Sequence, residues 1–136
     1  MNAAQRAMAE LLKRDRRFKL EAYVFVREAL NYAHQHMTGD TWDDDPDSED
    51  SRHLTGQQLC EACRRFALEQ YGYLSKLVLA SWGLRSTSDF GDVVYNLIEI
   101  EHMRKSPTDR REDFDGVYAF EDAFEPKFEL LSPEEA

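Results

Sequence analysis

The chain has 136 residues, 42% hydrophobic and 32% charged, with a formal net charge of −10. This length and composition predict one globular domain and argue against a disordered chain. Two cysteines are too few for a disulfide-rich secreted scaffold, no apolar run reaches the roughly 18–20 residues that span a bilayer, and the charged N-terminus does not resemble a secretory signal. We therefore expect a cytoplasmic protein without a membrane partner.

The charge is unevenly distributed along the chain. Residues 1–36 hold seven Lys and Arg against four Asp and Glu, residues 37–53 hold one against seven, and residues 106–136 hold three against ten. The two acidic segments would repel a phosphate backbone, so nucleic acid is not the expected partner. Solubility, with attraction between the basic and acidic parts, is the simplest interpretation; an acidic tail that binds a basic partner is the alternative.

Two helices are predicted in the first quarter of the chain. Residues 3–12 are strong helix formers, and residues 18–37 carry two apolar stripes, which indicate a central helix. The acidic residues of 38–53 then predict a mobile loop. An EF-hand calcium loop would need Gly and Glu where this segment has Ser48 and Leu54, so the match fails.

The middle of the chain predicts three more helices, over residues 54–71, 73–82 and 88–103. Thr55 and Gln58 have the spacing of a capping box at the start of the first. The second resumes the apolar stripe through Leu74, Leu77, Val78 and Ser81 and is expected to end at Gly83, and the cluster 86–89 offers caps for the third.

The C-terminal part is less regular. Ser106 and Pro107 read as the start of a short acidic helix that ends near Phe114. Residues 117–120 fit a helix or a strand, with helix preferred. Together these elements predict an all-α compact bundle of five to six helices over residues 1–125, with a small C-terminal β-hairpin, as in a winged helix, as the variant. Residues 126–136 predict an extended or disordered acidic tail.

Cys60 and Cys63 form a C-x-x-C pair inside a predicted helix. A structural zinc site needs two further ligands, of which only His53 is close in sequence, and a thioredoxin-type pair would follow a strand. Packing of both thiols in the core is therefore the expectation, and a small metal-binding protein or enzyme using both cysteines and a histidine is the alternative. No catalytic residue, metal or cofactor is predicted.

In a winged-helix arrangement, residues 88–103 would form the recognition helix that enters the DNA major groove. That helix carries Asp89, Asp92, Glu99 and Glu101, which is the wrong sign for a phosphate-lined groove. The cationic residues are concentrated in 13–19, so a DNA-binding regulator would use the N-terminus and is retained as an alternative only.

Six segments carry a family resemblance: residues 20–26, 53–59, 67–72, the Trp-Gly-Leu-Arg-Ser-Thr stretch at 82–87, 89–94, and 111–120. As a set, spread over residues 18–124, they resemble a protein family largely confined to planctomycete and verrucomicrobial bacteria. That family has no assigned activity, cofactor or catalytic residue, so the resemblance implies only an intracellular bacterial protein.

The expected function is a non-enzymatic protein–protein interaction or adaptor module. Trp and Arg are favoured at interfaces, so the candidate partner-binding residues are Trp82, Arg85, Asp89 and Arg111, and the expected partner is a protein. The alternative is that Arg85, Asp89, Arg111, Glu112 and Asp113 build a salt-bridged junction between helices, with Trp82 in the core.

Overall fold

The structure is a computed structural model that describes residues 2–36, 54–104 and 110–124. Within these ranges it is helical and contains no strand, which confirms the all-α prediction. The elements are α1 (Ala3–Arg14), α2 (Leu20–His36), α3 (Gly56–Tyr71), the 3₁₀ helix η2 (Gly72–Leu74), α4 (Ser75–Ser81), α5 (Thr87–Glu99), the 3₁₀ helix η3 (Arg111–Phe114) and α6 (Phe120–Ala123). No helix in the described part of the chain is long and apolar enough to cross a bilayer.

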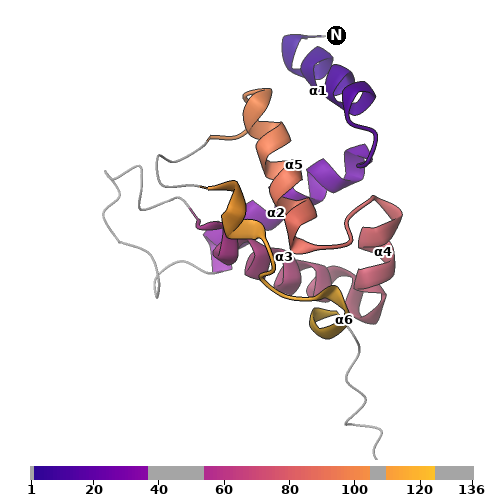
Figure 1. The fold of residues 1–136 in the computed structure, drawn as a ribbon, viewed down its shortest axis with the longest axis vertical. Coiled ribbons are helices and arrows are strands. Elements are labelled where there is room, and N and C mark those ends of the chain that lie inside the picture. The colour runs from indigo at the N-terminus through magenta and orange to yellow at the C-terminus, as the bar shows by residue number, and fades with distance from the viewer. Residues whose placement is uncertain (1, 37–53, 105–109, 125–136) are drawn as a thin grey trace, which may run out of the picture.

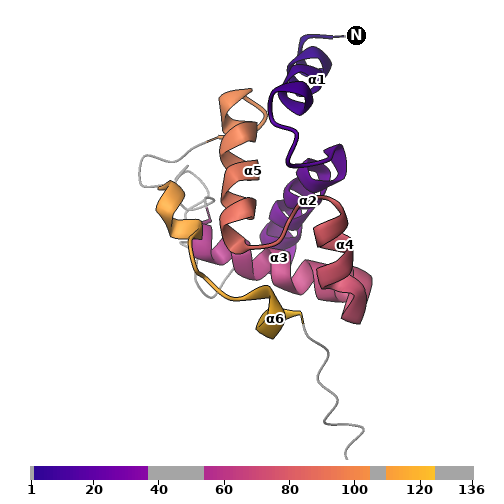
Figure 2. The same ribbon diagram turned by 45° about the vertical axis from the view of Figure 1, so that its right-hand side comes forward.

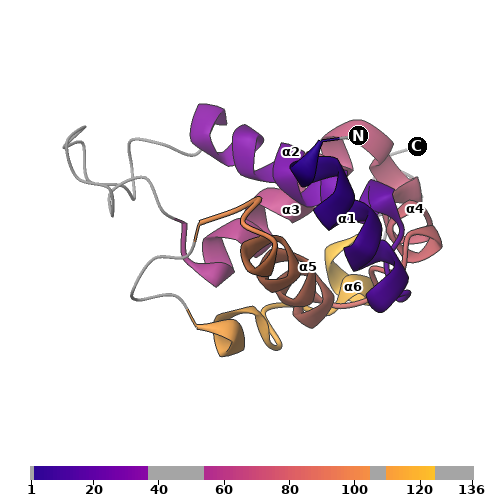
Figure 3. The ribbon, with the colours of Figure 1, turned by 90° about the horizontal axis from the view of Figure 1, so that it is seen from above.

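The helices form one bundle around α2 and α5. Helix α2 packs on α3 and α5, η3 packs on α5 and α3, and α4 packs on α3. α1 lies at one end of the long axis and α6 at the other (Figures 1 and 2). Seen from above, α5 lies between α2 on one side and η3 on the other (Figure 3). The prediction of a central helix over residues 18–37 therefore agrees with the position of α2.

The core is joined by aromatic rings from several elements. The Phe25 ring on α2 lies 5.6 Å from Phe66 on α3, 6.0 Å from Trp82 at the end of α4 and 6.3 Å from Phe90 on α5, measured between ring centroids. Such pairs stabilise by about 0.5–1.5 kcal/mol each beyond the burial of their area. One buried ring thus connects four helices.

The starts of α3 and α5 follow the predicted caps. The Thr55 hydroxyl accepts from the Gln58 backbone N–H at 3.1 Å, and the Gln58 side chain accepts from the Thr55 N–H at 2.9 Å, which completes the capping box of α3. Ser86 caps α5 by accepting from the Asp89 N–H at 3.3 Å. These bonds satisfy backbone donors that a helix start leaves without partners.

Helix α4 ends as predicted at Gly83. With φ of 98° at Gly83, the Gly83 N–H donates to Ala80 O at 3.0 Å and the Leu84 N–H to Leu79 O at 2.9 Å. Leu79 and Leu84 are both fully buried, as expected for the apolar pair of a Schellman motif.

Helix α5 uses the same motif without glycine and ends at Glu99, four residues before the predicted end at 103. Glu101 has φ of 62°, and the His102 N–H donates to Leu97 O at 2.8 Å. The early end could not be predicted because glycine, the usual signal for this backbone conformation, is absent.

The C-terminal part differs from the preferred prediction. Val117–Ala119 are neither helix nor strand, and helix α6 begins only at Phe120. The Val117 N–H donates to Thr87 Oγ1 at 3.2 Å, and the Tyr118 hydroxyl donates to Cys60 O at 2.7 Å. These tertiary hydrogen bonds hold the stretch in a non-helical conformation. The predicted loop 38–53, the helix start at Ser106 and the tail 126–136 lie outside the described residues.

Candidate functional site

Trp82 and Arg85 lie in the connection between α4 and α5, and Asp89 lies in the first turn of α5. The Trp82 ring is half-buried, 5.9 Å from the Tyr71 ring as well as close to Phe25. The Asp89 carboxylate accepts from the Arg85 backbone N–H at 2.9 Å, while the Arg85 side chain is exposed. Two of these predicted residues are thus used partly for structure, and Arg85 remains available to a partner.

Arg111 is held by a set of polar contacts between η3 and α5. Its guanidinium donates to Asp92 Oδ1 at 2.7–2.8 Å, to Asp115 Oδ1 at 2.9 Å and to Ser88 O at 3.0 Å. A salt-bridged junction is therefore present at Arg111, but its carboxylates are Asp92 and Asp115 and not the predicted Asp89, Glu112 and Asp113. Sequence reasoning had placed Asp92 only on an acidic helix face.

The same contacts continue to the linker between α1 and α2. Arg17 donates to the other oxygen of Asp92 at 2.9 Å and to Asp15 at 2.8 Å, and Asn96 donates to Asp15 at 3.0 Å and to the Tyr23 hydroxyl at 3.1 Å. The hydrogen bonds from Arg17 are the largest cause that lowers the pKa of Asp15, with a smaller contribution from Asn96. This network joins three elements, which is a structural role.

Helix α5 does not have the surface of a DNA-reading helix. It packs against α2, α3 and η3, and of its residues only Glu99 is exposed rather than buried or half-buried. A recognition helix needs an open face that enters the major groove. The winged-helix alternative therefore gains no support from this arrangement.

Cys60 and Cys63 are both fully buried and unpaired, which confirms the prediction that they pack in the core. Burial raises the pKa of Cys60 to about 12 and that of Cys63 well above its usual value, so both are neutral thiols near pH 7. Among the described residues no three His, Cys, Asp or Glu side chains lie close enough to share a metal ion. His53, the histidine nearest in sequence, lies outside that part.

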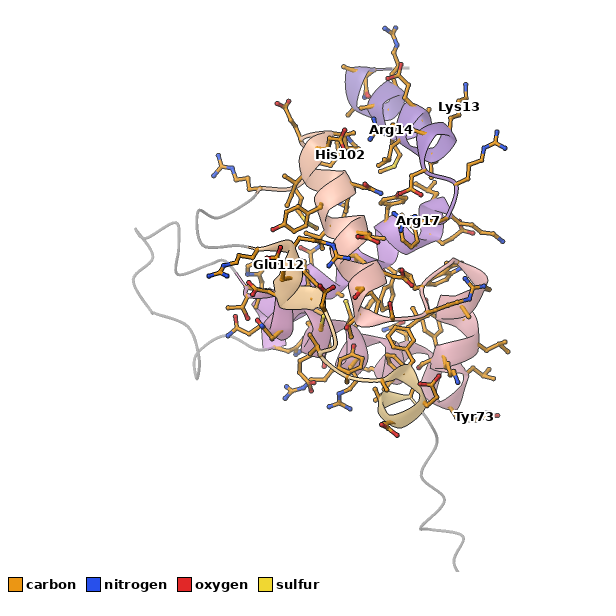
Figure 4. All side chains as sticks on the ribbon, viewed as in Figure 1. Lys13, Arg14, Arg17, Tyr73, His102 and Glu112 are labelled. Carbon is orange, nitrogen blue, oxygen red and sulfur yellow. The ribbon has the colours of Figure 1, made fainter. Side chains whose placement is uncertain are left out.

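The main feature that sequence reasoning missed is an exposed apolar face on η2 and α4. Tyr73 is 72% exposed, Leu74 47% and Leu77 70%. Helix α4 instead buries Ser75, whose hydroxyl donates to Ala67 O at 2.9 Å, and Leu79, so the predicted apolar stripe through Leu74 and Leu77 points outward. We call Tyr73, Leu74 and Leu77 the α4 face. Figure 4 shows Tyr73 at the far end of the molecule from Lys13 and Arg14.

A groove adjoins the α4 face and shares Tyr73 with it. Its volume is about 750 Å³, within the roughly 300–1,000 Å³ usual for binding pockets. Its apolar lining is Leu68, Tyr73, Val117, Tyr118, Ala123 and Phe124, and its charged rim is Glu61, Arg64 and Asp122. The groove thus lies between α3 from Glu61 onward, η2 and residues 117–124.

Two ionisable groups of the groove, Glu61 and Tyr118, have pKa values shifted away from 7. Glu61 accepts from Arg64 at 2.6 Å, which is the largest cause that lowers the pKa of Glu61. Burial raises the pKa of the Tyr118 hydroxyl, which donates to Cys60 O. Glu61 therefore stays ionised and Tyr118 protonated near pH 7, and neither has the pKa near 7 that suits a general acid or base.

Comparison with protein-family models, with curated proteins and with solved structures finds no match to this chain. Its function is therefore inferred from its own residues.

Proposed function

We propose that this chain is a non-enzymatic protein–protein interaction module, and that its binding surface is the α4 face together with the adjoining groove. The observation that supports this most directly is the exposure of Tyr73 at 72%, Leu74 at 47% and Leu77 at 70% on one short stretch. Single exposed apolar residues are ordinary, whereas a contiguous group beside a groove is typical of an interaction site.

The size of this surface suits a protein partner. A large side chain contributes roughly 150–250 Å² when its full area is counted, so the three exposed fractions leave on the order of 350 Å² of largely apolar area. A standard interface buries about 800 Å² on each side. The α4 face and the groove can therefore supply the apolar centre of such an interface.

The partner is expected to present a short amphipathic segment. Grooves with apolar floors bind helices or extended segments through a few large side chains. The cations nearby are already paired, Arg64 with Glu61 at 2.6 Å and Lys76 with Glu121 at 3.6 Å, so apolar contacts provide most of the affinity. Trp82 and Arg85, which the sequence predicted as partner-binding residues, follow the other end of α4. We include them in the proposed binding surface.

The remaining sequence-based predictions complete this proposal. We place the protein in the cytoplasm, with a protein partner, and we retain the resemblance to the planctomycete and verrucomicrobial family as a prediction.

The test compares variants of the full chain. A partner recovered by affinity purification from the native host is purified and titrated against wild type, Leu77→Asp and Tyr73→Ser. Val24→Asp is the matched control, since Val24 is 44% exposed on α2. We expect at least a tenfold loss of affinity for Leu77→Asp and a change under twofold for Val24→Asp.

Folding must be unchanged for this comparison, and exposed positions allow that, since surface substitutions shift stability by only about 0.5 kcal/mol. Recovery of no protein above background would contradict the proposal. So would a partner that binds Leu77→Asp and Tyr73→Ser as tightly as wild type.

A further inference from the structure

The groove lies directly beside the point where the described chain leaves α6. Phe124, the residue after α6, is 1% exposed and lines the groove. The sequence continues for twelve residues, 125–136, which lie outside the described part of the chain. This segment contains three large apolar residues, Phe128, Leu130 and Leu131, among four glutamates.

We propose that residues 125–136 of the same chain occupy the groove and cover part of the α4 face, with Phe128 in the groove. This inference rests on the proposed function, because it concerns the same surface and names a competitor for it. It assigns to the partner the same chemistry, a short segment with an aromatic residue followed closely by aliphatic ones.

The length of the connecting chain allows this docking. Phe128 is four positions after Phe124 in the sequence, and four extended residues span at most about 14 Å. A volume of about 750 Å³ corresponds to a cube about 9 Å on a side, so a side chain on this tether can reach any part of the groove. Leu130 and Leu131 are farther along and can reach the α4 face.

The tether also compensates for a weak intrinsic affinity. A short flexible connection holds a segment near its site at an effective concentration in the millimolar range. A segment that binds as a free peptide with a dissociation constant of about 0.1 mM would then occupy the groove about ten times more often than not. Partners must displace it, so their apparent affinity falls by the same factor.

Charge makes a small contribution to this docking. Arg64 and Lys76 each already pair with a carboxylate of the folded chain, and Glu61, Glu121 and Asp122 lie at or near the rim. The glutamates of the segment therefore gain little attraction there. We expect binding that changes little with salt concentration, unlike binding driven by charge.

The experiment uses a fluorescein-labelled peptide with the sequence of residues 125–136, titrated with full-length protein by fluorescence anisotropy. The tail variant carries Phe128→Ser and Leu131→Ser, which empties the groove of its own segment. We expect the tail variant to bind the peptide about ten times more tightly than wild type does. Adding Tyr73→Asp to the tail variant should abolish binding, and adding Val24→Asp should change it less than twofold.

Three results would overturn the inference: no binding of the peptide to the tail variant, equal affinity for wild type and the tail variant, or no effect of Tyr73→Asp. Light scattering that shows a dimer, lost in Leu77→Asp and kept in the tail variant, would assign the surface to a second copy and would also overturn it. The partner titration uses no peptide, so the inference and the proposed function can fail separately.

Discussion

Gly83 offers the sharpest test of how the helices are joined. It has φ of 98°, and a Cβ built on it would overlap the Arg17 carbonyl oxygen and lie 3.0 Å from the Arg17 carbonyl carbon and 3.3 Å from the Phe18 ring. Two of these three contacts are backbone atoms, which cannot turn aside as a flexible side chain can. Gly83→Ala must therefore push the linker between α1 and α2 away from the end of α4.

The expected loss of stability has three contributions. An L-residue in a left-handed conformation costs about 1–2 kcal/mol. Moving the linker breaks the 3.1 Å hydrogen bond from Lys19 N–H to Trp82 O, which contributes about 0.5–1.5 kcal/mol. Phe18, 2% exposed, has to repack at about 1–3 kcal/mol. We expect a total of about 3–5 kcal/mol, a large share of the roughly 5–15 kcal/mol that holds such a domain folded.

Urea unfolding followed by circular dichroism measures this loss as a change in the free energy of unfolding. Gly72→Ala is the control, because Gly72 also has a positive φ, 55°, but has no atom within 4 Å of the added Cβ. Gly72 has a ψ of −131°, a combination that L-residues rarely adopt, so only this conformational cost, about 1–3 kcal/mol, should appear there. If Gly83→Ala loses no more stability than Gly72→Ala, the close packing of the linker on α4 is wrong.

Further predictions concern the buried polar and thiol groups. Arg111→Ala should lower the free energy of unfolding by about 1–3 kcal/mol in the same urea assay, because the Arg111 side chain is only 30% exposed and joins three partners. Arg14→Ala is the control. Arg14 makes one ion pair at 3.4 Å and its side chain is 53% exposed, so its loss should change the free energy of unfolding by less than about 0.5 kcal/mol. The pKa of Asp15 is lowered in the folded chain, so its carboxylate stabilises the fold above about pH 4, and this stabilisation is lost as pH falls below the unfolded value. Asp15→Asn should therefore unfold less steeply than wild type between pH 4 and 2 when ellipticity is followed, and identical acid profiles would contradict this. Cys60 and Cys63 should resist a maleimide in the native state at pH 7 and react fully in urea, as mass spectrometry can count; rapid native labelling would show that the thiols are accessible.

The starts of α3 and α5 and the end of α4 were readable from the sequence because their signals are local. The capping box of Thr55 and Gln58 and the stop at Gly83 each depend on residues three or four positions apart. Glu101 shows the limit of such signals, since a non-glycine residue in the left-handed conformation ends α5 early. The backbone there follows from packing that no short pattern encodes.

The candidate site was predicted only in part. Trp82 and Arg85 were placed beside α4, but the exposed Leu74 and Leu77 were expected to continue an apolar stripe. Which side a seven-residue helix buries depends on where its neighbours lie. Here α4 buries Ser75, whose hydroxyl donates to Ala67 O at 2.9 Å, together with Leu79, so Leu77 faces outward. The groove, likewise, forms between segments separated by some fifty residues in the chain.

By itself the sequence determined the helical class of this protein, the caps of α3 and α5 and the burial of its two thiols, because the spacing of apolar residues and the chemistry of helix ends act over a few positions. Only the tertiary structure decided which apolar residues remain on the surface and which carboxylate Arg111 meets. Those outcomes depend on contacts between segments that are distant in the sequence. The local free energy of a helix is similar whichever of its two faces is buried, so only its neighbours decide which face that is.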